Sequence, residues 1–386
     1  MVLTGMGGSG KSYVIDAIKN LLKERCKVCS YFGIAAFNVS GTTLHSLLQL
    51  PIKGRKNGPL KSVALAKLQN DFQKIECLII DEFSVTGQKM FAWINRRCQE
   101  GTGQNTIPFG GISIILAGDI AQLPPITDQV IYHNKAKSDL ALEGYCMYHK
   151  FDTVVKLQVK ERARGSSNDQ QLFRELQIRA RDDNSSLEAW KLLLTRVPDN
   201  IPNRTEFEKE SVRLSFGNEN VARDNYAKLR NLNELIVQVD AKHSCNKAKH
   251  LPAEDMGGLE PKIYLSKNAR VMLTRNLWVD VGLSNGAMGN VIDIIYAENH
   301  CPLVLPIAIL VQFDTKDYTG PTFLDHIPNC VPIYPIVSNS DSYGSNFQRQ
   351  QFPLRLSWSI TIHKSQGLTL KKAWIDLGHS ERELPD

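Results

Sequence analysis

The feature that most constrains this chain is a glycine-rich segment near its start, residues 5–12. It reads Gly-Met-Gly-Gly-Ser-Gly-Lys-Ser and fits the pattern G-x-x-x-x-G-K-[ST] at every fixed position. Residues 1–4 are apolar enough to end a β-strand, and residues 14–22 carry apolar side chains at the spacing of one helix face. A strand, a glycine loop and a helix in this order predict a phosphate-binding loop.

The chemistry of this segment follows from its glycines and from its lysine. Glycines let the backbone turn its N–H groups inward around an anion, and the following helix adds partial positive charge at its N-terminus. Lys11 would reach the β- and γ-phosphates, and the Ser12 hydroxyl would ligate Mg²⁺. A glycine-rich turn that binds nothing is the alternative. We expect a nucleoside triphosphate to be held by Gly5, Gly7, Gly8, Ser9, Gly10, Lys11 and Ser12.

Length and composition set broad limits. At 386 residues the chain is long enough for two or three domains with buried cores. Its net charge of +6 favours an anionic partner, although many basic proteins bind no nucleic acid. The most apolar run, residues 302–313, contains two prolines and is about half the length of a membrane span, so no membrane is expected. The scattered cysteines and the lack of a signal peptide favour free thiols in a reducing compartment.

A pair of acids follows a second apolar strand. Residues 77–80 are Cys-Leu-Ile-Ile, and Asp81 and Glu82 come directly after them. At the carboxyl end of a strand beside a phosphate-binding loop, Asp81 would hold Mg²⁺, and Glu82 would position and deprotonate the attacking water. Two exposed acids in a turn are the alternative. We expect the metal to be held by Ser12 and Asp81.

A third polar group follows the strand predicted at residues 112–117. The segment 118–125 reads Gly-Asp-Ile-Ala-Gln-Leu-Pro-Pro, and Gln122 can contact a γ-phosphate or its water. A loop glutamine is otherwise usually just solvated. Because strands alternate with helices, the sequence predicts a parallel, doubly wound sheet whose strand ends share one edge.

The remaining elements are predicted more coarsely. A buried strand at 28–32 runs into residues 33–37, a short helix through Leu50 begins near Thr43, and residues 60–72 have helical spacing. Residues 157–190 are helical and charged, which usually indicates a solvated face. A strand at 212–216 precedes a helix around 221–232, and residues 270–337 alternate short strands with turns, as in a small β-barrel.

These signals, in this order, resemble the Pif-type, RecD-like branch of superfamily 1 DNA helicases. The resemblance runs essentially from end to end, and the patterns G-D-x-x-Q-L-P-P and T-x-H-K-S-Q-G are specific. The matching stretches are GMGGSGKS (5–12), GIAAFNVSGTTLHS (33–46), DEFS (81–84), LAGDIAQLPPI (116–126), LQVKERAR (157–164), ARVMLTRNL (269–277), GLSNGAMGNV (282–291) and ITIHKSQGLTL (360–370).

The resemblance implies an α/β fold with two RecA-like P-loop NTPase domains, each built on a parallel sheet, and a small inserted SH3-like β-barrel. We expect the first domain at residues 1–150, the second at 151–274 and 353–386, and the barrel at 275–352. ATP would bind between the two RecA-like domains, with single-stranded DNA crossing both.

The resemblance also implies residue roles. Arg162 falls where the family has an arginine that reaches the γ-phosphate from the second domain, so the expected catalytic residues are Lys11, Asp81, Glu82, Gln122 and Arg162. The stretches that line the DNA path contain Thr43, His45, His363, Lys364 and Gln366. His45 as a helix cap and His363 as a satisfied loop histidine are the alternatives. Residues 53–57 match the wedge loop in position only.

The function implied is that of an ATP-dependent 5′-to-3′ DNA helicase, a hydrolase with ATP and Mg²⁺ as cofactors and single-stranded DNA or DNA junctions as partners. DNA repair, recombination and telomere maintenance are the processes the resemblance suggests, with a monomeric chain in the nucleus; mitochondrion and cytoplasm are the alternatives.

Two family elements are not seen in the sequence: the adenine-binding glutamine upstream of the glycine loop, and a final arginine motif expected after residue 378. An arginine finger contributes roughly 10³–10⁵ in rate. A truncated or degenerate helicase-derived protein, binding ATP and nucleic acid without efficient unwinding, is therefore the second hypothesis. A GTPase or small-molecule kinase is a poor third, since residues 134–137, Asn-Lys-Ala-Lys, lack the aspartate that recognises guanine.

Overall fold

The computed structural model describes residues 1–51, 58–159, 167–184, 186–298, 304–314, 318–340 and 347–377. Within them the chain forms two compact units. The first comprises Met1–Tyr31, Ser46–Leu50 and Leu60–Glu210, and the second comprises Phe32–His45, Pro51–Pro59 and Ser211–Asp386. The domain limits expected from the sequence stay predictions.

The first unit is an α/β unit with several short 3₁₀ turns. Its elements are β1 (Val2–Gly5), α1 (Lys11–Leu22), η1 (Lys23–Arg25), β2 (Cys26–Ser30), α4 (Ser62–Phe72), β4 (Cys77–Asp81), η2 (Phe83–Val85), α5 (Gln88–Thr102), η3 (Pro108–Gly111), β5 (Ser113–Gly118), α6 (Asp139–Tyr148), β6 (Val154–Leu157), α7 (Asn168–Arg181), α8 (Leu187–Leu194), η4 (Pro198–Asn200) and α9 (Arg204–Glu210). Helix α3 (Leu44–Leu48) crosses the limit at His45.

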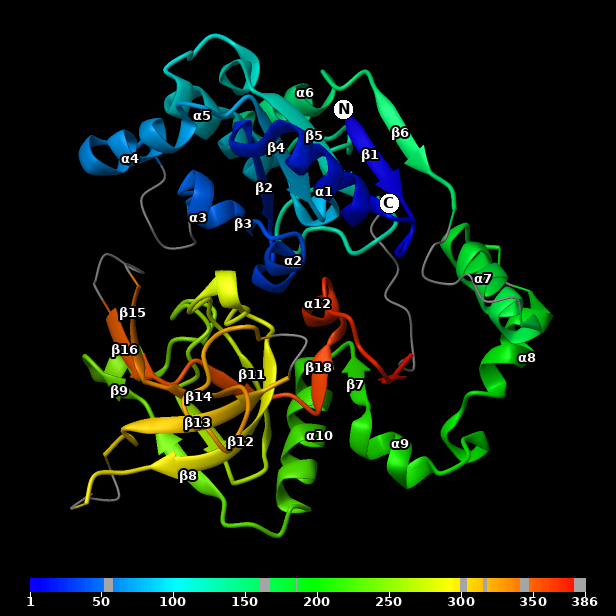
Figure 1. The fold of residues 1–386 in the computed structure, drawn as a ribbon, viewed down its shortest axis with the longest axis vertical. Helices are drawn as coiled ribbons and strands as arrows, with labels where there is room; N and C mark the ends of the chain where they lie inside the picture. Colours follow the sequence, from blue (N-terminus) through cyan, green and yellow to red (C-terminus); the bar gives the residue numbers. More distant parts are fainter. Residues whose placement is uncertain are drawn as a thin grey trace. The chain divides into compact units, whose positions relative to one another are not determined.

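The strands of this unit belong to a six-stranded sheet with the order β3-β2-β4-β5-β1-β6, in which β3 is Thr42–Thr43 (Figure 1). The pairs β2–β4, β4–β5, β5–β1 and β1–β6 are all parallel. Leu78, Ile79 and Ile80 of β4 are fully buried. A continuously apolar strand of this kind is suited to the interior of a parallel sheet, which is covered on both faces. The α/β class and the parallel sheet predicted from the sequence are thus confirmed.

Helix α2 (Gly33–Asn38) differs from the expectation that a strand runs into residues 33–37. The strand β2 ends at Ser30, and the Ala36 N–H donates to the carbonyl of Phe32 over 2.9 Å, which begins a helical turn. Ile34, Ala35 and Ala36 are all buried. A short apolar run looks the same in a buried strand and in a buried helix, so periodicity did not separate the two.

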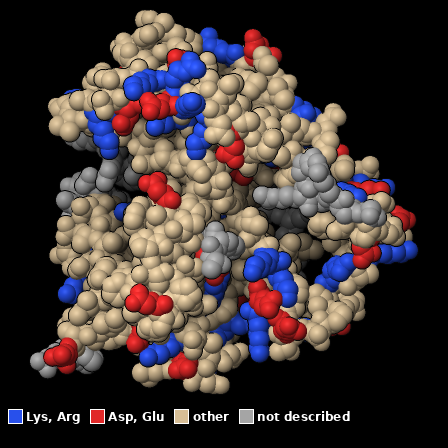
Figure 2. Space-filling view, in the orientation of Figure 1, with Lys and Arg blue, Asp and Glu red and all other residues tan. Residues whose placement is uncertain are grey.

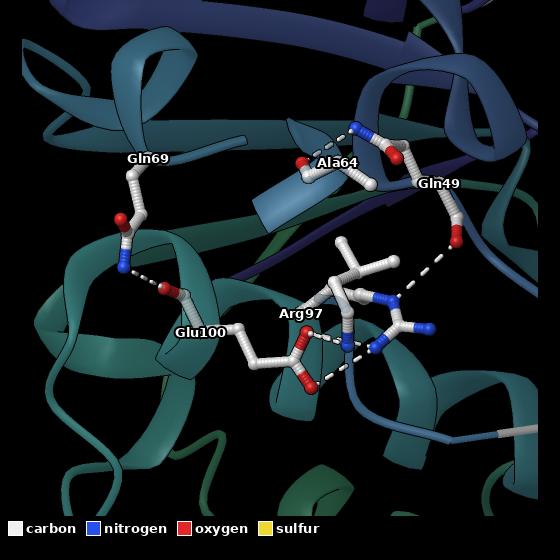
Figure 3. Close-up of polar contacts among 6 residues, drawn as sticks. Gln49, Ala64, Gln69, Arg97 and Glu100 are labelled. Atoms are coloured by element: carbon white, nitrogen blue, oxygen red, sulfur yellow. Dashed lines mark hydrogen bonds and ion pairs between the residues drawn. The ribbon is translucent and has the colours of Figure 1, made fainter. Parts of the chain in front are cut away.

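A buried ion pair organises the part of the first unit around α5. The Arg97 Nη1 atom lies 2.8 Å from Glu100 Oε2, and the two side chains are only 3% and 17% exposed. Arg97 Nε donates to the carbonyl of Gln49 (Figure 3). Glu100 Oε2 accepts from the backbone N–H of Leu60. Gln69 donates to the Glu100 carbonyl, which ties α4 to α5. The pair therefore connects three segments that are separate in the sequence.

The second unit contains most of the antiparallel structure. Its elements are α2, β3, β7 (Val212–Ser215), α10 (Asn218–Arg230), β8 (Val237–Asp240), β9 (Lys242–His243), α11 (Asn246–Lys249), β10 (Lys262–Leu265), β11 (Arg270–Leu273), η5 (Val279–Val281), β12 (Met288–Ile295), β13 (Ala308–Phe313), β14 (Cys330–Ile333), β15 (Ile336–Ser340), β16 (Phe347–Gln351), β17 (Leu354–Leu356), β18 (Ser359–Thr361), α12 (Ile362–Ser365) and β19 (Ala373–Ile375).

These strands form one parallel and several antiparallel sheets. The parallel sheet has the order β18-β7-β19, and an antiparallel sheet has the order β14-β13-β12-β11-β17. Two smaller sheets are β15-β16-β9 and β10-β8. Val271, Ile309, Val311 and Phe352 lie in the main core of this unit and are fully buried. The short strands expected in residues 270–337 are present, while their description as an SH3-like barrel stays a prediction.

The surface carries charged side chains of both signs. In the face shown in Figure 2, lysines and arginines are interspersed with aspartates and glutamates, so the net charge of +6 is not gathered into one field there. None of the helices that the structure describes has the length and apolarity needed to cross a membrane.

Candidate functional site

The nucleotide-site residues predicted from the sequence lie at one edge of the six-stranded sheet. In the parallel register Thr4 is opposite Gly118, and Asp81 is opposite Ala117. The strands β1, β4 and β5 therefore end side by side, and each continues into a predicted functional segment: residues 5–12, 81–82 and 119–122. The structure thus brings together Lys11, Ser12, Asp81, Glu82 and Gln122, which are distant in the sequence.

The glycine loop between β1 and α1 has the backbone shape of an anion cradle. Gly8 and Gly10 have φ angles of 80° and 91°, a region that other residues adopt at a cost. Gly5 is closely packed, because a Cβ placed there would lie 2.5 Å from Ser9 Oγ and 2.9 Å from the carbonyl of Leu157. The Ser9 hydroxyl is buried and has no hydrogen-bond partner among the described residues. A phosphate oxygen would satisfy it.

Lys11 begins α1 and folds its side chain back over the loop. Its Nζ atom donates to the carbonyl oxygens of Gly5 and Met6 over 2.7 and 3.1 Å. The ammonium group is therefore held next to the loop backbone, at the end of β1, where a bound phosphate would compete for it.

Asp81 and Glu82 form the acidic part of the site. Asp81 is 7% exposed, and burial together with the neighbouring Glu82 raises the pKa of its carboxyl to about 7, while Lys11 acts in the opposite direction. Glu82 has φ 56° and ψ 45°, the left-handed region that side chains other than glycine seldom adopt. This backbone directs the chain out of β4 into the turn Phe83–Val85.

The donor set fits a magnesium ion. A buried carboxylate with a raised pKa is a site where a divalent cation would replace the proton. Among the described residues no group of three or more His, Cys, Asp or Glu side chains is placed to hold a metal. Mg²⁺ keeps several waters and is usually bound by one or two protein groups plus substrate phosphates, so Ser12 and Asp81 match its requirements.

Gln122 lies in the turn after β5, and the backbone of this turn is held by Asp119. The Asp119 carbonyl accepts from the Gln122 N–H over 3.0 Å, and Asp119 Oδ1 accepts from the Ala121 N–H over 3.1 Å. The Gln122 Oε1 atom is buried with no hydrogen-bond partner in the part of the chain that the structure describes. An amide oxygen in this state is suited to accept a hydrogen bond from a ligand or its water.

The predicted DNA-contacting residues all belong to the second unit. Thr43 is buried in β3, and His45 lies one residue into α3. Burial lowers the pKa of His45, which favours the neutral form of its imidazole.

Lys364 lies in α12 between His363 and Ser365. Burial, followed by the charge of Arg355, lowers the pKa of Lys364 to about 8, whereas Glu260 and Glu254 oppose that shift. Arg355 itself pairs with Glu260 over 3.0 Å. A largely buried lysine whose pKa is lowered in this way is a candidate for binding an anion, because a bound anion would favour its charged form.

Phe216 was not predicted as a functional residue. It follows β7 directly, the residue is 61% exposed, and its ring centroid lies 6.4 Å from that of His363. An exposed aromatic ring beside a predicted DNA-binding histidine is a candidate for stacking on a base. The signal available in the sequence was an aromatic residue placed directly after the carboxyl end of a strand.

The segment of α2 packs against two other motif segments of the second unit. Asn38 Nδ2 donates to the carbonyl of Gly367 over 3.1 Å, and a Cβ at Gly367 would lie 3.1 Å from Ala35 Cβ. A Cβ at Gly33 would collide with the side chain of Asn276, which in turn accepts from the Asn285 N–H over 2.8 Å. Three stretches from distant parts of the sequence are therefore neighbours.

Two predictions fall outside the residues that the structure describes. Arg162 lies in residues 160–166, and the wedge-loop match at 53–57 lies in residues 52–57. Both stay predictions, as do the roles assigned to the residues above.

A glycine loop that leads into a helix, an acidic pair and a glutamine at one edge of a parallel sheet define the class of P-loop NTPases. Comparison with known proteins narrows this class. Residues 1–180 match the family described as PIF1-like helicase. Over 97% of its length the chain is also similar to proteins named ATP-dependent DNA helicase Pif1.

The chain is also similar to individual proteins of known sequence. The protein named ATP-dependent DNA helicase Pif1 of Psychrobacter sp. is 29% identical, over 97% of this chain and 61% of its own length. The ATP-dependent DNA helicase PIF1 of Homo sapiens is 28% identical, over 97% of this chain and 54% of its own. The fold is that of a Pif1 helicase from Bacteroides crystallised with ADP-AlF3 and single-stranded DNA, with a TM-score of 0.69, 23% identity and coverage of 98% of this chain and 82% of the other.

The chain thus spans between half and two thirds of the length of these two curated relatives.

Proposed function

We propose that this chain is the motor region of an ATP-dependent DNA helicase that moves along single-stranded DNA by hydrolysing ATP. The observation that carries the proposal is the shared sheet edge, where Asp81 ends β4 and where Lys11 and Gln122 lie in the segments that follow the neighbouring strands β1 and β5. The homologous proteins are named ATP-dependent DNA helicases, and the second unit holds a separate set of candidate DNA contacts.

In the first unit each residue has a distinct role. The loop N–H groups and Lys11 bind the phosphates, and releasing the carbonyls of Gly5 and Met6 frees the Lys11 ammonium for this contact. Ser12 and Asp81 hold Mg²⁺, which neutralises charge developing on the phosphates. Glu82 accepts the proton of the attacking water, and Gln122 orients that water by accepting a hydrogen bond from it with its amide oxygen, which is buried without a partner among the described residues.

In the second unit the candidate contacts suit an interaction with the phosphate backbone and base faces of DNA that does not depend on base sequence. Lys364 and Thr43 interact with phosphates, and Phe216 and His363 provide ring faces for bases. The 5′-to-3′ direction is part of the proposal and rests on the motif resemblance in the sequence.

The experiment measures ATP hydrolysis by the protein with and without an oligo(dT) strand, for the wild type, Lys11→Ala and Lys74→Ala. Lys74 is a matched control because it is a 75%-exposed lysine of the same unit. We expect hydrolysis that single-stranded DNA stimulates, that Lys11→Ala abolishes and that Lys74→Ala leaves unchanged.

Strand separation is then measured on duplexes with either a 5′ or a 3′ single-stranded tail. Unwinding of the 5′-tailed duplex alone supports the stated direction, and unwinding of the 3′-tailed duplex alone contradicts it. Hydrolysis that single-stranded DNA does not stimulate would rule out a DNA motor, and nucleotide binding without hydrolysis would leave a binding protein.

A further inference from the structure

An ion pair connects the turn that carries Gln122 to the end of a later helix, 62 residues further along the chain. Arg181 Nη1 donates to Asp119 Oδ1 over 2.5 Å, and the side chains are 23% and 7% exposed. Arg181 is the last residue of α7, and Asp119 is the first residue after β5. Both belong to the first unit, and neither was assigned a role from the sequence.

The geometry of Asp119 shows what this ion pair holds. One carboxylate oxygen, Oδ1, accepts from both Arg181 and the Ala121 N–H, while the Asp119 carbonyl accepts from the Gln122 N–H. The carboxylate therefore holds the turn from inside, and it is almost completely buried. A buried carboxylate without a cation would be costly, so the guanidinium of Arg181 is what allows the aspartate to keep this position.

The Arg181–Asp119 ion pair does not simply follow from burial of the helix α7. No residue of α7 is buried, and its apolar side chains Leu172, Phe173 and Ile178 are 38%, 51% and 43% exposed. Arg181, by contrast, is directed to one buried acceptor at the end of β5. Its place at the C-terminus of α7 is also favourable, because a positive charge complements the negative end of the helix dipole.

We infer that Arg181 is a positioning residue for the glutamine of the nucleotide site. It fixes the carboxylate of Asp119, Asp119 fixes the turn, and the turn places the Gln122 amide, whose oxygen has no partner among the described residues, where it can accept a hydrogen bond from the attacking water. The inference rests on the proposed function for the chemistry that Gln122 performs. The mechanical coupling from Arg181 to the turn is independent of hydrolysis.

The first test measures that coupling without any substrate. Hydrogen–deuterium exchange is followed in the peptide covering residues 119–124 for the wild type, Arg181→Met and Arg196→Met. Arg196 is the matched control, since it forms an exposed ion pair with Asp169 at the start of α7. Faster exchange of this peptide in Arg181→Met alone is expected. Unchanged exchange in Arg181→Met, or an equal increase in Arg196→Met, overturns the inference whether or not the protein hydrolyses ATP.

The second test separates positioning from binding. In Arg181→Met, kcat for ATP hydrolysis with oligo(dT) is expected to fall about 10- to 100-fold, because small displacements of a positioned group have effects of that size. KM for ATP and the affinity for ADP should stay within about threefold, since the glycine loop is untouched; ADP with aluminium fluoride should lose its tighter binding. Arg181→Lys should restore part of kcat.

A double variant decides whether Arg181 acts through Gln122. If it does, Arg181→Met adds little to the loss of kcat already caused by Gln122→Ala. If the kcat of the double variant falls by the product of the two single losses, the inference is contradicted. A loss of ADP affinity and thermal stability in Arg181→Met that parallels its loss of kcat also contradicts it. A wild type that binds ADP but never hydrolyses ATP refutes the proposed function, while the exchange experiment still decides the coupling.

Discussion

Arg97 and Glu100 form a buried ion pair one helical turn apart on α5, with Arg97 Nη1 donating to both carboxylate oxygens of Glu100. The pair joins α5 to the carbonyl of Gln49 (Figure 3) and to the N–H of Leu60, so its removal affects more than one helix.

The first prediction concerns this pair. Arg97→Met should lower the free energy of unfolding by about 3–5 kcal/mol, because it leaves the largely buried Glu100 carboxylate without its cation. Arg96→Met is the matched control: Arg96 lies next to Arg97, both guanidinium groups lie over the Trp93 ring, and the Arg96–Glu143 pair is far more exposed. Its loss should be below about 1 kcal/mol. Equal effects of the two substitutions in urea unfolding would contradict the prediction.

The second prediction concerns the pH dependence of stability at Asp81. Its folded-state pKa of about 7 is above the ordinary value of 3.8, so the folded protein binds the proton more tightly and loses stability as pH rises from about 4 to about 7. Asp81→Asn removes this loss. The variant should be more stable than the wild type at pH 8 by up to about 4 kcal/mol, with the difference vanishing near pH 4.

Urea unfolding of both proteins across this range, without Mg²⁺, measures the difference. A stability gap that is the same at pH 4.5 and pH 8 would be inconsistent with a raised pKa at Asp81. Adding Mg²⁺ should stabilise the wild type more than Asp81→Asn, because only the carboxylate binds the ion strongly.

The third prediction concerns the pH dependence of DNA binding through Lys364. Its pKa of about 8 means that the ammonium loses its proton within an accessible range, and a bound phosphate favours the charged form. The affinity for oligo(dT) should therefore fall as pH rises from 7 to 9.5, by up to about tenfold per pH unit above 8. Lys364→Arg should remove most of this fall, since arginine stays charged.

Fluorescence anisotropy of labelled oligo(dT) at constant ionic strength gives the affinities. The exposed Lys371→Arg serves as control and should keep the wild-type pH profile. The groups that face Lys364 are Arg355, Glu260 and Glu254, and a slope that survives in Lys364→Arg would assign the titration to another group.

The fourth prediction concerns Phe216. Phe216→Ala should weaken oligo(dT) binding by about 1–3 kcal/mol, the usual size of one base–aromatic stacking contact. ATP hydrolysis in the absence of DNA should not change, and Phe216→Trp should retain the affinity. Phe323→Ala, at an aromatic residue of similar exposure, should have no effect. Binding unaltered in Phe216→Ala would remove the ring from the proposed DNA contacts.

The strands and the glycine loop that carry the expected nucleotide-site residues could be predicted from the sequence because their signals are local. Four glycines before Lys11, and two acids after an apolar strand, identify their elements without tertiary information. The parallel sheet then follows from the alternation of strands and helices, and it places the carboxyl ends of β1, β4 and β5 together.

The rest depended on contacts between distant residues. Residues 33–37 lie in a short buried helix. The apolar pattern of so short a run fits a buried strand equally well, so periodicity could not distinguish the two. From the sequence, Arg181 is one of several charges on a helix predicted to be solvated. Its ion pair with Asp119 is visible only in the structure. Likewise, the grouping of Asn38 with Gly367 joins residues more than three hundred positions apart.

The left-handed backbone at Glu82 opposes stability to the proposed catalytic role of this side chain. A residue with a Cβ at φ 56° costs about 1 kcal/mol relative to glycine, so Glu82→Gly should make the protein more stable while it removes the proposed base. A library selected only for thermal tolerance should enrich glycine or asparagine at position 82, and one selected for turnover should retain glutamate. In laboratory evolution of this chain, the residue found at position 82 would therefore show whether selection had acted on stability or on turnover.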